Sequence, residues 1–234
     1  MQIENEKGKL QYFFDGNDAP VNGAWVDKIS GIRFVLYKNN TTSGAESLWN
    51  QAQGWYEFEG QNNNYAQLYS MNDVDFNWGH HWRLEFDLYQ NGANSTSTFW
   101  DLGSVGTSNK AMGFMLIPQN VSYPQGTMGC NWKLLGNNSN PGIMNVSPPG
   151  LAFVSNGDQF VRYTGSYSIL DGGDGYDRMH RTLNNYSDII PVQVPKVKYG
   201  PTWKSAQSRM GKSIYSIGYY SDVKIRSLKV YVID

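Results

Sequence analysis

The sequence has little that would support disulfide, zinc or membrane chemistry. Its 234 residues include one cysteine, Cys130, and three histidines. An intrachain disulfide is therefore excluded, and the spacing of these residues matches no cysteine–histidine zinc pattern. We interpret Cys130 as a small apolar strand residue rather than a nucleophile, because free cysteine is usually buried. No apolar run approaches the roughly 18 residues of a membrane-spanning helix, so we expect no membrane partner.

Charge is also scarce. Charged residues make up 17% of the chain, the formal net charge is −1, and no basic block or acidic tail occurs. Binding to nucleic acid by phosphate neutralisation needs a concentrated basic face, so we expect no nucleic-acid partner. The first ten residues lack the basic start and apolar stretch of a signal peptide. We therefore expect that the protein is made without export or that the sequence is a domain excised from a longer protein. We expect it to act on a virion or at an extracellular surface.

Aromatic and turn-forming residues are abundant and favour an all-β fold. Aromatics reach 15% and there are 25 glycines, while clusters of Asn, Asp and Gly separate short runs rich in aromatic and β-branched residues. Helix signals are limited to 45–52 and 202–210. We predict one domain over 1–234 with strands at 10–14, 32–37, 55–59, 65–69, 82–89, 98–102, 111–117, 131–135, 159–167, 178–184, 213–219 and 223–232.

Two of these strands show clear alternation. In 82–89 the apolar residues share one face and the polar residues share the other, which is typical of a half-buried strand. In 223–232, Val223 and Ile225 have one parity, and Leu228 and the later valines have the opposite parity. A one-residue bulge near 226–227 would keep all of them facing the core.

Several segments resemble those of laminin G-like, concanavalin A-like domains. The end of the chain, 208–215 with 220–231, resembles their closing segment, in which a strand ending in Gly is followed by a loop and a strand of the pattern G-x-I-x-x-L/V-x-I/V-Y. Segment 13–31 is similar to their opening strand and first loop, and 56–60 with 65–68 to the following strand pair. One departure is Ser221-Asp222, where the family often has a glycine.

This resemblance implies a jelly-roll sandwich of two antiparallel sheets, one of them curved. The fold hosts lectins, sugar-binding and adhesion modules, glucanases, lyases and virion components. Because fold does not fix function, the site has to be considered on its own.

The segment Glu85-Phe-Asp-Leu-Tyr-Gln90 is similar to the Glu-x-Asp-x-x-Glu strand of laminarinase-type glucanases. Glu85 and Asp87 share a strand face. A retaining glycosidase needs two carboxyl groups about 5–5.5 Å apart. The last Glu of that motif, which acts as the acid, corresponds to Gln90 here, or to Tyr89 if the strand has no bulge. Neither side chain suits proton donation to a glycoside. We therefore predict that the chain is not an enzyme; a simpler alternative is that these carboxylates pair with neighbouring charges on a solvated sheet face.

Strand parity also predicts a ligand-binding surface on a concave sheet face. Aromatic rings with polar neighbours suit a sugar, whose C–H face stacks and whose hydroxyl rim needs partners. The alternative is that half of the aromatics are core residues. The predicted ligand-binding residues are Arg83, Glu85, Asp87, Tyr89, Trp100 and Trp132.

An acidic, glycine-rich loop is the candidate metal site. Asp171, Asp174 and Asp177 could offer oxygen ligands to Ca²⁺, the one cofactor that the sequence suggests. The loop lacks the closing Glu of an EF-hand, and a simple hairpin turn is the alternative that we favour.

Three functions remain in order of preference. The first is a non-catalytic, lectin-like adhesion or recognition module that binds a glycan or another ligand at a cell or virus surface. The second is a structural virion protein, such as a decoration, fibre or tail component, that self-assembles or binds other virion proteins. The third is a glycoside hydrolase or polysaccharide lyase.

Overall fold

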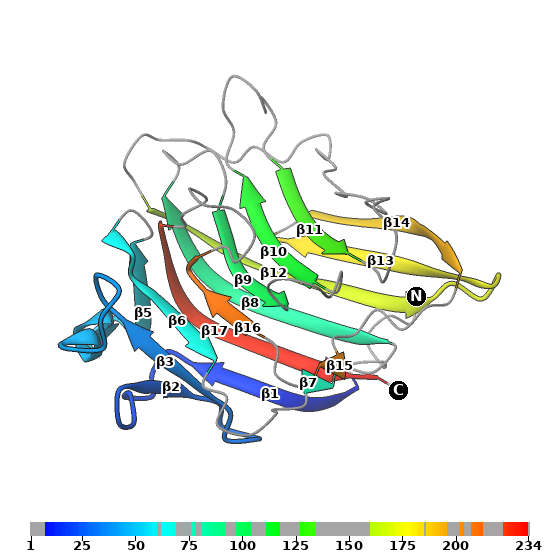
Figure 1. Ribbon diagram of the computed structural model, residues 1–234. Helices are drawn as coiled ribbons and strands as arrows, with labels where there is room; N and C mark the ends of the chain where they lie inside the picture. Colours follow the sequence, from blue (N-terminus) through cyan, green and yellow to red (C-terminus); the bar gives the residue numbers. More distant parts are fainter. Residues whose placement is uncertain are drawn as a thin grey trace.

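The computed structural model shows a two-layer, jelly-roll β-sandwich (Figure 1). It describes residues 8–59, 62–68, 76–77, 81–91, 97–103, 111–117, 127–133, 160–184, 186–195, 202–203, 207–212 and 222–233. Every strand pair in these residues is antiparallel. No helix in the described part of the chain is long and apolar enough to cross a membrane.

Sheet A contains the first and last strands of the chain. Its order is β14 (Tyr186–Pro195), β13 (Tyr176–Leu183), β12 (Phe160–Asp171), β8 (Trp82–Asn91), β17 (Asp222–Val232), β5 (Trp55–Glu59) and β4 (Trp49–Asn50), and β1 (Lys9–Asp15) also pairs with β17. Strands β5 and β1 share one edge of β17, because β5 pairs with its first half and β1 with its second half.

Sheet B forms the other layer. Its order is β11 (Thr127–Lys133), β10 (Ala111–Ile117), β9 (Ser97–Gly103), β16 (Gln207–Met210), β6 (Tyr65–Leu68), β3 (Arg33–Tyr37) and β2 (Ala24–Val26). A small separate pair joins β7 (Phe76–Asn77) to β15 (Thr202–Trp203). One 3₁₀ turn, η1 (Ala45–Leu48), lies within the segment 45–52 for which we predicted a short helix.

The predicted bulge in the last strand is confirmed. The register of β17 on β8 shifts between Ile225 and Ser227, so Arg226 is the extra residue. Val223, Ile225, Leu228 and Val230 are consequently all buried. The bulge lies where β17 changes partner from β5 to β1, and the backbone carbonyl of Arg226 accepts a hydrogen bond from the N–H of Gly16.

Aromatic side chains join the two sheets. Phe14 of sheet A meets Phe34 and Trp100 of sheet B edge to face, with centroid distances of 5.2 and 5.9 Å. Farther along the core, Trp82 of sheet A packs on Phe114 of sheet B at 5.8 Å. Such edge-to-face pairs each add about 0.5–1.5 kcal/mol beyond the burial of their surface. The high aromatic content therefore supplies the interior between the layers.

Some elements differ from the sequence predictions. The predicted helical turn at 202–210 is wrong, because its two described parts are the strands β15 and β16, and β16 is held between β9 and β6. Strand β14 was not predicted; it contains Pro191, which an edge strand tolerates since proline cannot donate to a neighbour. The predicted strand 213–219 lies outside the described residues.

Candidate functional site

The alternation in β8 creates the candidate ligand surface. Trp82, Leu84, Phe86 and Leu88 are buried at 0–3% exposure, and the intervening residues reach solvent on the other side. Neighbouring strands β12 and β17 extend this exposed side across sheet A. The predicted residues Arg83, Glu85, Asp87 and Tyr89 therefore lie in one row on the outer side of the sheet.

Both predicted carboxylates of this row form ion pairs. Arg162 of β12 binds Asp87 through two hydrogen bonds, from Nε at 2.9 Å and from an Nη atom at 2.8 Å. The hydrogen bond to Asp87 raises the pKa of Arg162. Arg83 Nε lies 2.9 Å from Glu85 Oε1, as an ion pair without hydrogen-bond geometry, and the Tyr231 hydroxyl donates to Glu85 Oε2 at 3.3 Å. Each of these two carboxylates is therefore paired with a cation, while Lys229, opposite Glu85 in the register, lies over the Phe13 ring.

One end of the row carries partly exposed aromatic side chains. The rings of Trp55 and Tyr89 are 5.1 Å apart and tilted by 58°. Lys224 Nζ lies 5.2 Å from the centre of the Trp55 ring and 4.0 Å from that of Phe160, and it forms a 2.9 Å ion pair with Glu57. This cluster unites strands β5, β8, β12 and β17. We call the whole surface the β8 face; it comprises Trp55, Glu57, Arg83, Glu85, Asp87, Tyr89, Phe160, Arg162, Lys224 and Tyr231.

The assignment of Trp100 to a ligand surface needs correction. Trp100 is fully buried, and its indole N–H donates to the Ser208 hydroxyl at 3.0 Å inside the protein. The reason is a bulge in β9, where the register on β10 shifts so that Phe99 and Trp100 both face the core. Trp132 lies on β11 of sheet B, away from β8, and its side chain is outside the described residues.

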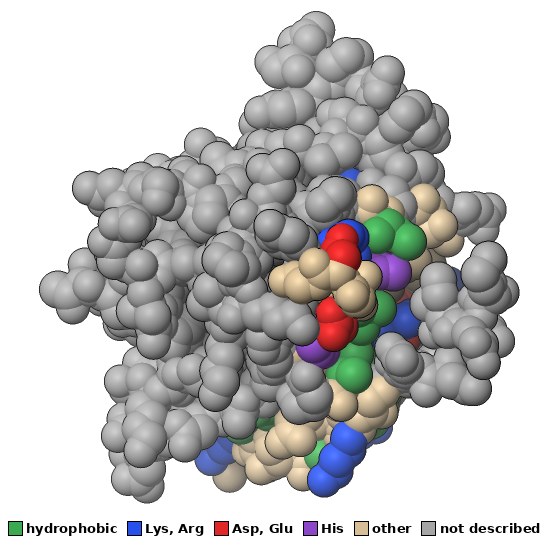
Figure 2. Space-filling view, turned by 90° about the vertical axis from the view of Figure 1, so that its right-hand side faces the viewer, with side chains coloured by type: hydrophobic (Ala, Val, Ile, Leu, Met, Phe, Trp, Pro, Cys, Tyr) green, Lys and Arg blue, Asp and Glu red, His purple; other side chains and the backbone are tan. Residues whose placement is uncertain are grey.

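The acidic loop forms the tip of the β12–β13 hairpin. Asp171 Oδ1 accepts a hydrogen bond from the N–H of Gly173 at 2.9 Å, and Asp174 forms an ion pair with Arg178. Figure 2 views the side where this hairpin projects and shows acidic, basic and histidine side chains close together. No cluster of three or more metal-ligating side chains occurs among the described residues, and the side chain of Asp177 is not one of them. Calcium binding by this loop stays a prediction.

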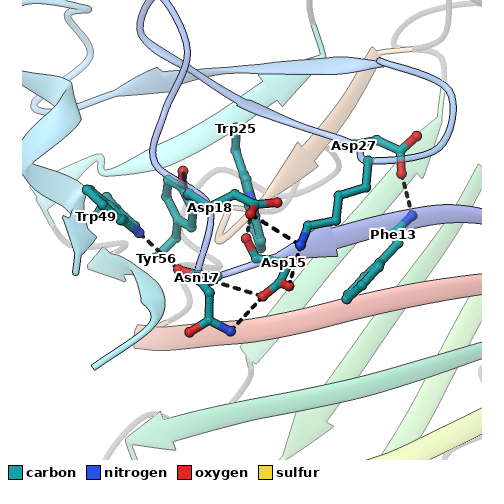
Figure 3. Close-up of polar contacts among 10 residues, drawn as sticks. Phe13, Asp15, Asn17, Asp18, Trp25, Asp27, Trp49 and Tyr56 are labelled. Atoms are coloured by element: carbon teal, nitrogen blue, oxygen red, sulfur yellow. Dashed lines mark hydrogen bonds and ion pairs between the residues drawn. The ribbon is translucent and has the colours of Figure 1, made fainter. Parts of the chain in front are cut away.

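A second polar cluster lies at the end of β1 (Figure 3). Three aromatic side chains, Trp25, Trp49 and Tyr56, donate hydrogen bonds of 2.8–3.0 Å to backbone carbonyls of residues 15–18. The Trp25 and Tyr56 rings also stack on each other at 4.3 Å. The side chains thus fix the course of the backbone as it leaves sheet A.

The carboxylates of this corner complete the same arrangement. Asp15 accepts hydrogen bonds from the N–H and the side-chain amide of Asn17 at 3.0 and 2.9 Å, and from Lys28 Nζ at 2.7 Å. Lys28 also lies 3.2 Å from Asp18. Since these groups hold the chain's own backbone and one another, we assign the corner a structural role.

Comparison with known proteins identifies the architecture. No protein-family model matches the chain, and no curated protein matches its sequence. A Trypanosoma rangeli sialidase in complex with sialic acid superposes with a TM-score of 0.51 at 11% identity, over 95% of this chain and 30% of the sialidase chain. The Ruminococcus gnavus IT-sialidase CBM40 bound to alpha2,6 sialyllactose gives 0.49 at 12% identity, over 76% of this chain and 89% of that one. The Emp46p carbohydrate recognition domain gives 0.42 at 10%, over 78% and 84%.

At these identities the comparisons show the fold alone. The sialidase match agrees with the β-sandwich that the sequence predicted, and the chain spans less than a third of the length of that sialidase.

Proposed function

We propose that the chain is a non-catalytic recognition module, a single domain over residues 1–234, that binds carbohydrate through the β8 face. The observation that carries this proposal is the position of Trp55 and Tyr89 beside ion pairs that are already formed. Planar rings suit the C–H face of a pyranose, and fixed charged groups offer donors and acceptors to its hydroxyls. A site whose polar groups are held in place loses little side-chain entropy when a ligand binds.

The same face supports a non-catalytic role. A retaining glycosidase needs one carboxylate as nucleophile and a second carboxylic acid that stays protonated. Here Asp87 is fixed by Arg162, and Glu85 contacts Arg83 and Tyr231. The residue at the third motif position, Gln90, is 1% exposed and faces the core, where its amide donates to the Leu116 carbonyl at 2.8 Å.

We further propose that the module is of the laminin G-like kind and acts at a cell or virion surface. The pairing of β1 with β17, which brings the opening and closing segments side by side, supports this family. An assembling virion component would show a closed oligomer by native mass spectrometry, so a monomeric mass would favour the recognition module.

A glycan array followed by calorimetry with the best neutral oligosaccharide tests the binding proposal. We expect Tyr89→Ala and Trp55→Ala to weaken binding at least about tenfold, about 1.4 kcal/mol. Phe13→Ala is the matched control, since Phe13 is a half-buried ring on β1 of the same sheet. Binding that is unchanged by Tyr89→Ala, or the absence of any neutral ligand at millimolar concentration, would contradict the proposal.

Catalysis is tested separately with glucan and uronate polymers. We expect no cleavage by the wild-type chain. Measurable cleavage that is lost in Glu85→Gln would refute the non-catalytic assignment.

A further inference from the structure

The bulge of β17 brings an extra side chain to the outer side of sheet A. Ile225 and Leu228 are buried in the core, and the two residues between them, Arg226 and Ser227, are both partly exposed. A regular strand would expose one residue between two buried ones, because its side chains alternate between the faces. The bulge therefore adds the Arg226 side chain to the surface beside the β8 face, and bulges that re-aim a side chain in this way recur next to functional sites.

The backbone around Gly16 places Arg226 beside Trp55 of the β8 face. The N–H of Gly16 donates to the Arg226 carbonyl at 2.6 Å. A Cβ added at Gly16 would lie 2.8 Å from that carbonyl oxygen and 2.9 Å from the Trp55 Cα, so both backbones border the space of a single methyl group. The Arg226 side chain therefore starts beside the ring on which we expect a sugar to stack.

Lys229 is the next outward-facing cation of β17 after the bulge. It is partly exposed between two buried residues, and its Nζ lies 4.8 Å from the centre of the Phe13 ring. Three residues of a strand span about 10 Å, so the long side chains of Arg226 and Lys229 can both approach one group bound between them. We call Arg226, Ser227 and Lys229 the β17 strip.

The two cations of the β17 strip are in excess over the carboxylates around them. Neither forms an ion pair with a carboxylate in the part of the chain that the structure describes. Three carboxylates lie opposite the strip in the strand register: Asp15, Asp87 and Glu85. Each of them already has a cation within 2.9 Å, namely Lys28, Arg162 and Arg83 in that order. The strip therefore carries positive charge that the neighbouring acids do not use.

We propose that the β17 strip binds the anionic group of an acidic glycan whose neighbouring sugar ring lies on Trp55. This inference rests on the proposed function and adds the charge of the ligand to it. The guanidinium of Arg226 suits a two-pronged contact with an oxyanion, Lys229 adds a second positive charge, and the hydroxyl of Ser227 lies between them as a further donor. The ion pairs of the β8 face are complete, so the strip is the part of the surface that distinguishes an acidic glycan from a neutral one. The carboxylate of a uronic acid and a sulfate ester share the required chemistry, so both are tested.

An array of neutral, uronic and sulfated glycans, followed by calorimetry, tests the proposal. Calorimetry compares the best acidic glycan with its own neutral form, which is the methyl ester of a uronate or the desulfated sugar. We expect the acidic form to bind at least about tenfold more tightly, about 1.4 kcal/mol. Its affinity should fall as salt is raised. Arg226→Gln and Lys229→Gln should each weaken acidic binding at least about threefold, because the two cations share the tenfold preference.

Lys9→Gln is the matched control, since Lys9 is an exposed cation on β1 of the same sheet, outside the β17 strip. It should leave acidic binding unchanged. Retained binding of the neutral form by each variant shows that the β8 face is still folded. Equal affinity for the acidic and neutral forms, or equal losses in Arg226→Gln and Lys9→Gln, would overturn the proposal.

The two proposals fail in different ways. An array on which no glycan binds overturns the proposed function and the β17 strip together. Neutral binding that depends on Tyr89, without a preference for any acidic form, overturns the β17 strip alone.

Discussion

The buried carboxylate of Asp27 offers the sharpest test of how the fold is held together. Asp27 follows β2 and is 2% exposed. Its Oδ1 accepts a hydrogen bond from the N–H of Phe13 in β1 (Figure 3). Its Oδ2 accepts hydrogen bonds from the N–H of Ile29 at 3.2 Å and from both the N–H and the hydroxyl of Ser30. One side chain thus connects a strand of sheet A to the turn that follows a strand of sheet B.

The expected loss for Asp27→Ala follows from what each donor does without its partner. Ile29 and Ser30 are exposed, so their N–H groups regain water. The part-buried N–H of Phe13 is left unpaired, which costs about 1–3 kcal/mol, and the lost charged hydrogen bonds in the turn add about 1 kcal/mol. We expect about 3 kcal/mol in all, which for a domain of this size lowers Tm by about 6–12 °C.

Urea unfolding followed by tryptophan fluorescence measures this loss. The control is Asp18→Ala, since Asp18 has a side chain that is 40% exposed and lies 3.2 Å from Lys28. An exposed pair of this kind contributes below about 1 kcal/mol. Asp27→Asn should lose an intermediate amount of unfolding free energy. Its amide oxygen still accepts hydrogen bonds, but its NH₂ group faces the N–H donors that the second carboxylate oxygen accepted from. A loss for Asp27→Ala that is no larger than that for Asp18→Ala would refute the reasoning.

Three further predictions concern packing, pH and register. A Cβ at Gly165 would lie 2.2 Å from the Thr182 carbonyl oxygen, so Gly165→Ala should cost about 1–3 kcal/mol in urea unfolding, and a loss below about 0.5 kcal/mol would contradict this. Burial raises the pKa of Asp15, but hydrogen bonds from Lys28 and Asn17 outweigh it and hold the pKa below its ordinary value. The stability that the Asp15 carboxylate contributes is therefore present above about pH 4 and is lost as pH falls through the lowered pKa. Lys28→Met should make this loss of stability at acid pH smaller. A pH profile of the urea midpoint that is the same in Lys28→Met and the wild type would contradict the prediction. Deleting Arg226 removes the extra residue and leaves β17 with one continuous alternation, so the near-ultraviolet circular dichroism of a packed core should be retained, and loss of that signal would contradict the parity argument.

The parts of the fold that follow from local pattern could be predicted from the sequence. The period of two in 82–89 gave the correct inner and outer faces of β8, and the change of parity after Ile225 located the bulge at Arg226. Both features are encoded within about ten consecutive residues. The physical cause is that successive side chains of a strand point to opposite faces, so a burial requirement is visible without knowledge of the partner strands.

The parts that depend on distant strands could not be predicted. The bulge in β9 buries Trp100 together with Phe99, and the sequence around it has no matching parity change to reveal this. The aromatic end of the β8 face is built by Trp55 and Lys224, which meet because β17 lies between β5 and β8. Nothing in the neighbourhood of either residue indicates that pairing, since strand order is set by the packing of the whole sheet.

The β8 face pairs its carboxylates with cations, and this pairing sets the kind of ligand that the face suits. On the β8 face each acid–base pair is complete, so a ligand there exchanges hydration for ring contacts and hydrogen bonds and gains little from its own charge. Salt should therefore leave neutral binding at the β8 face nearly constant.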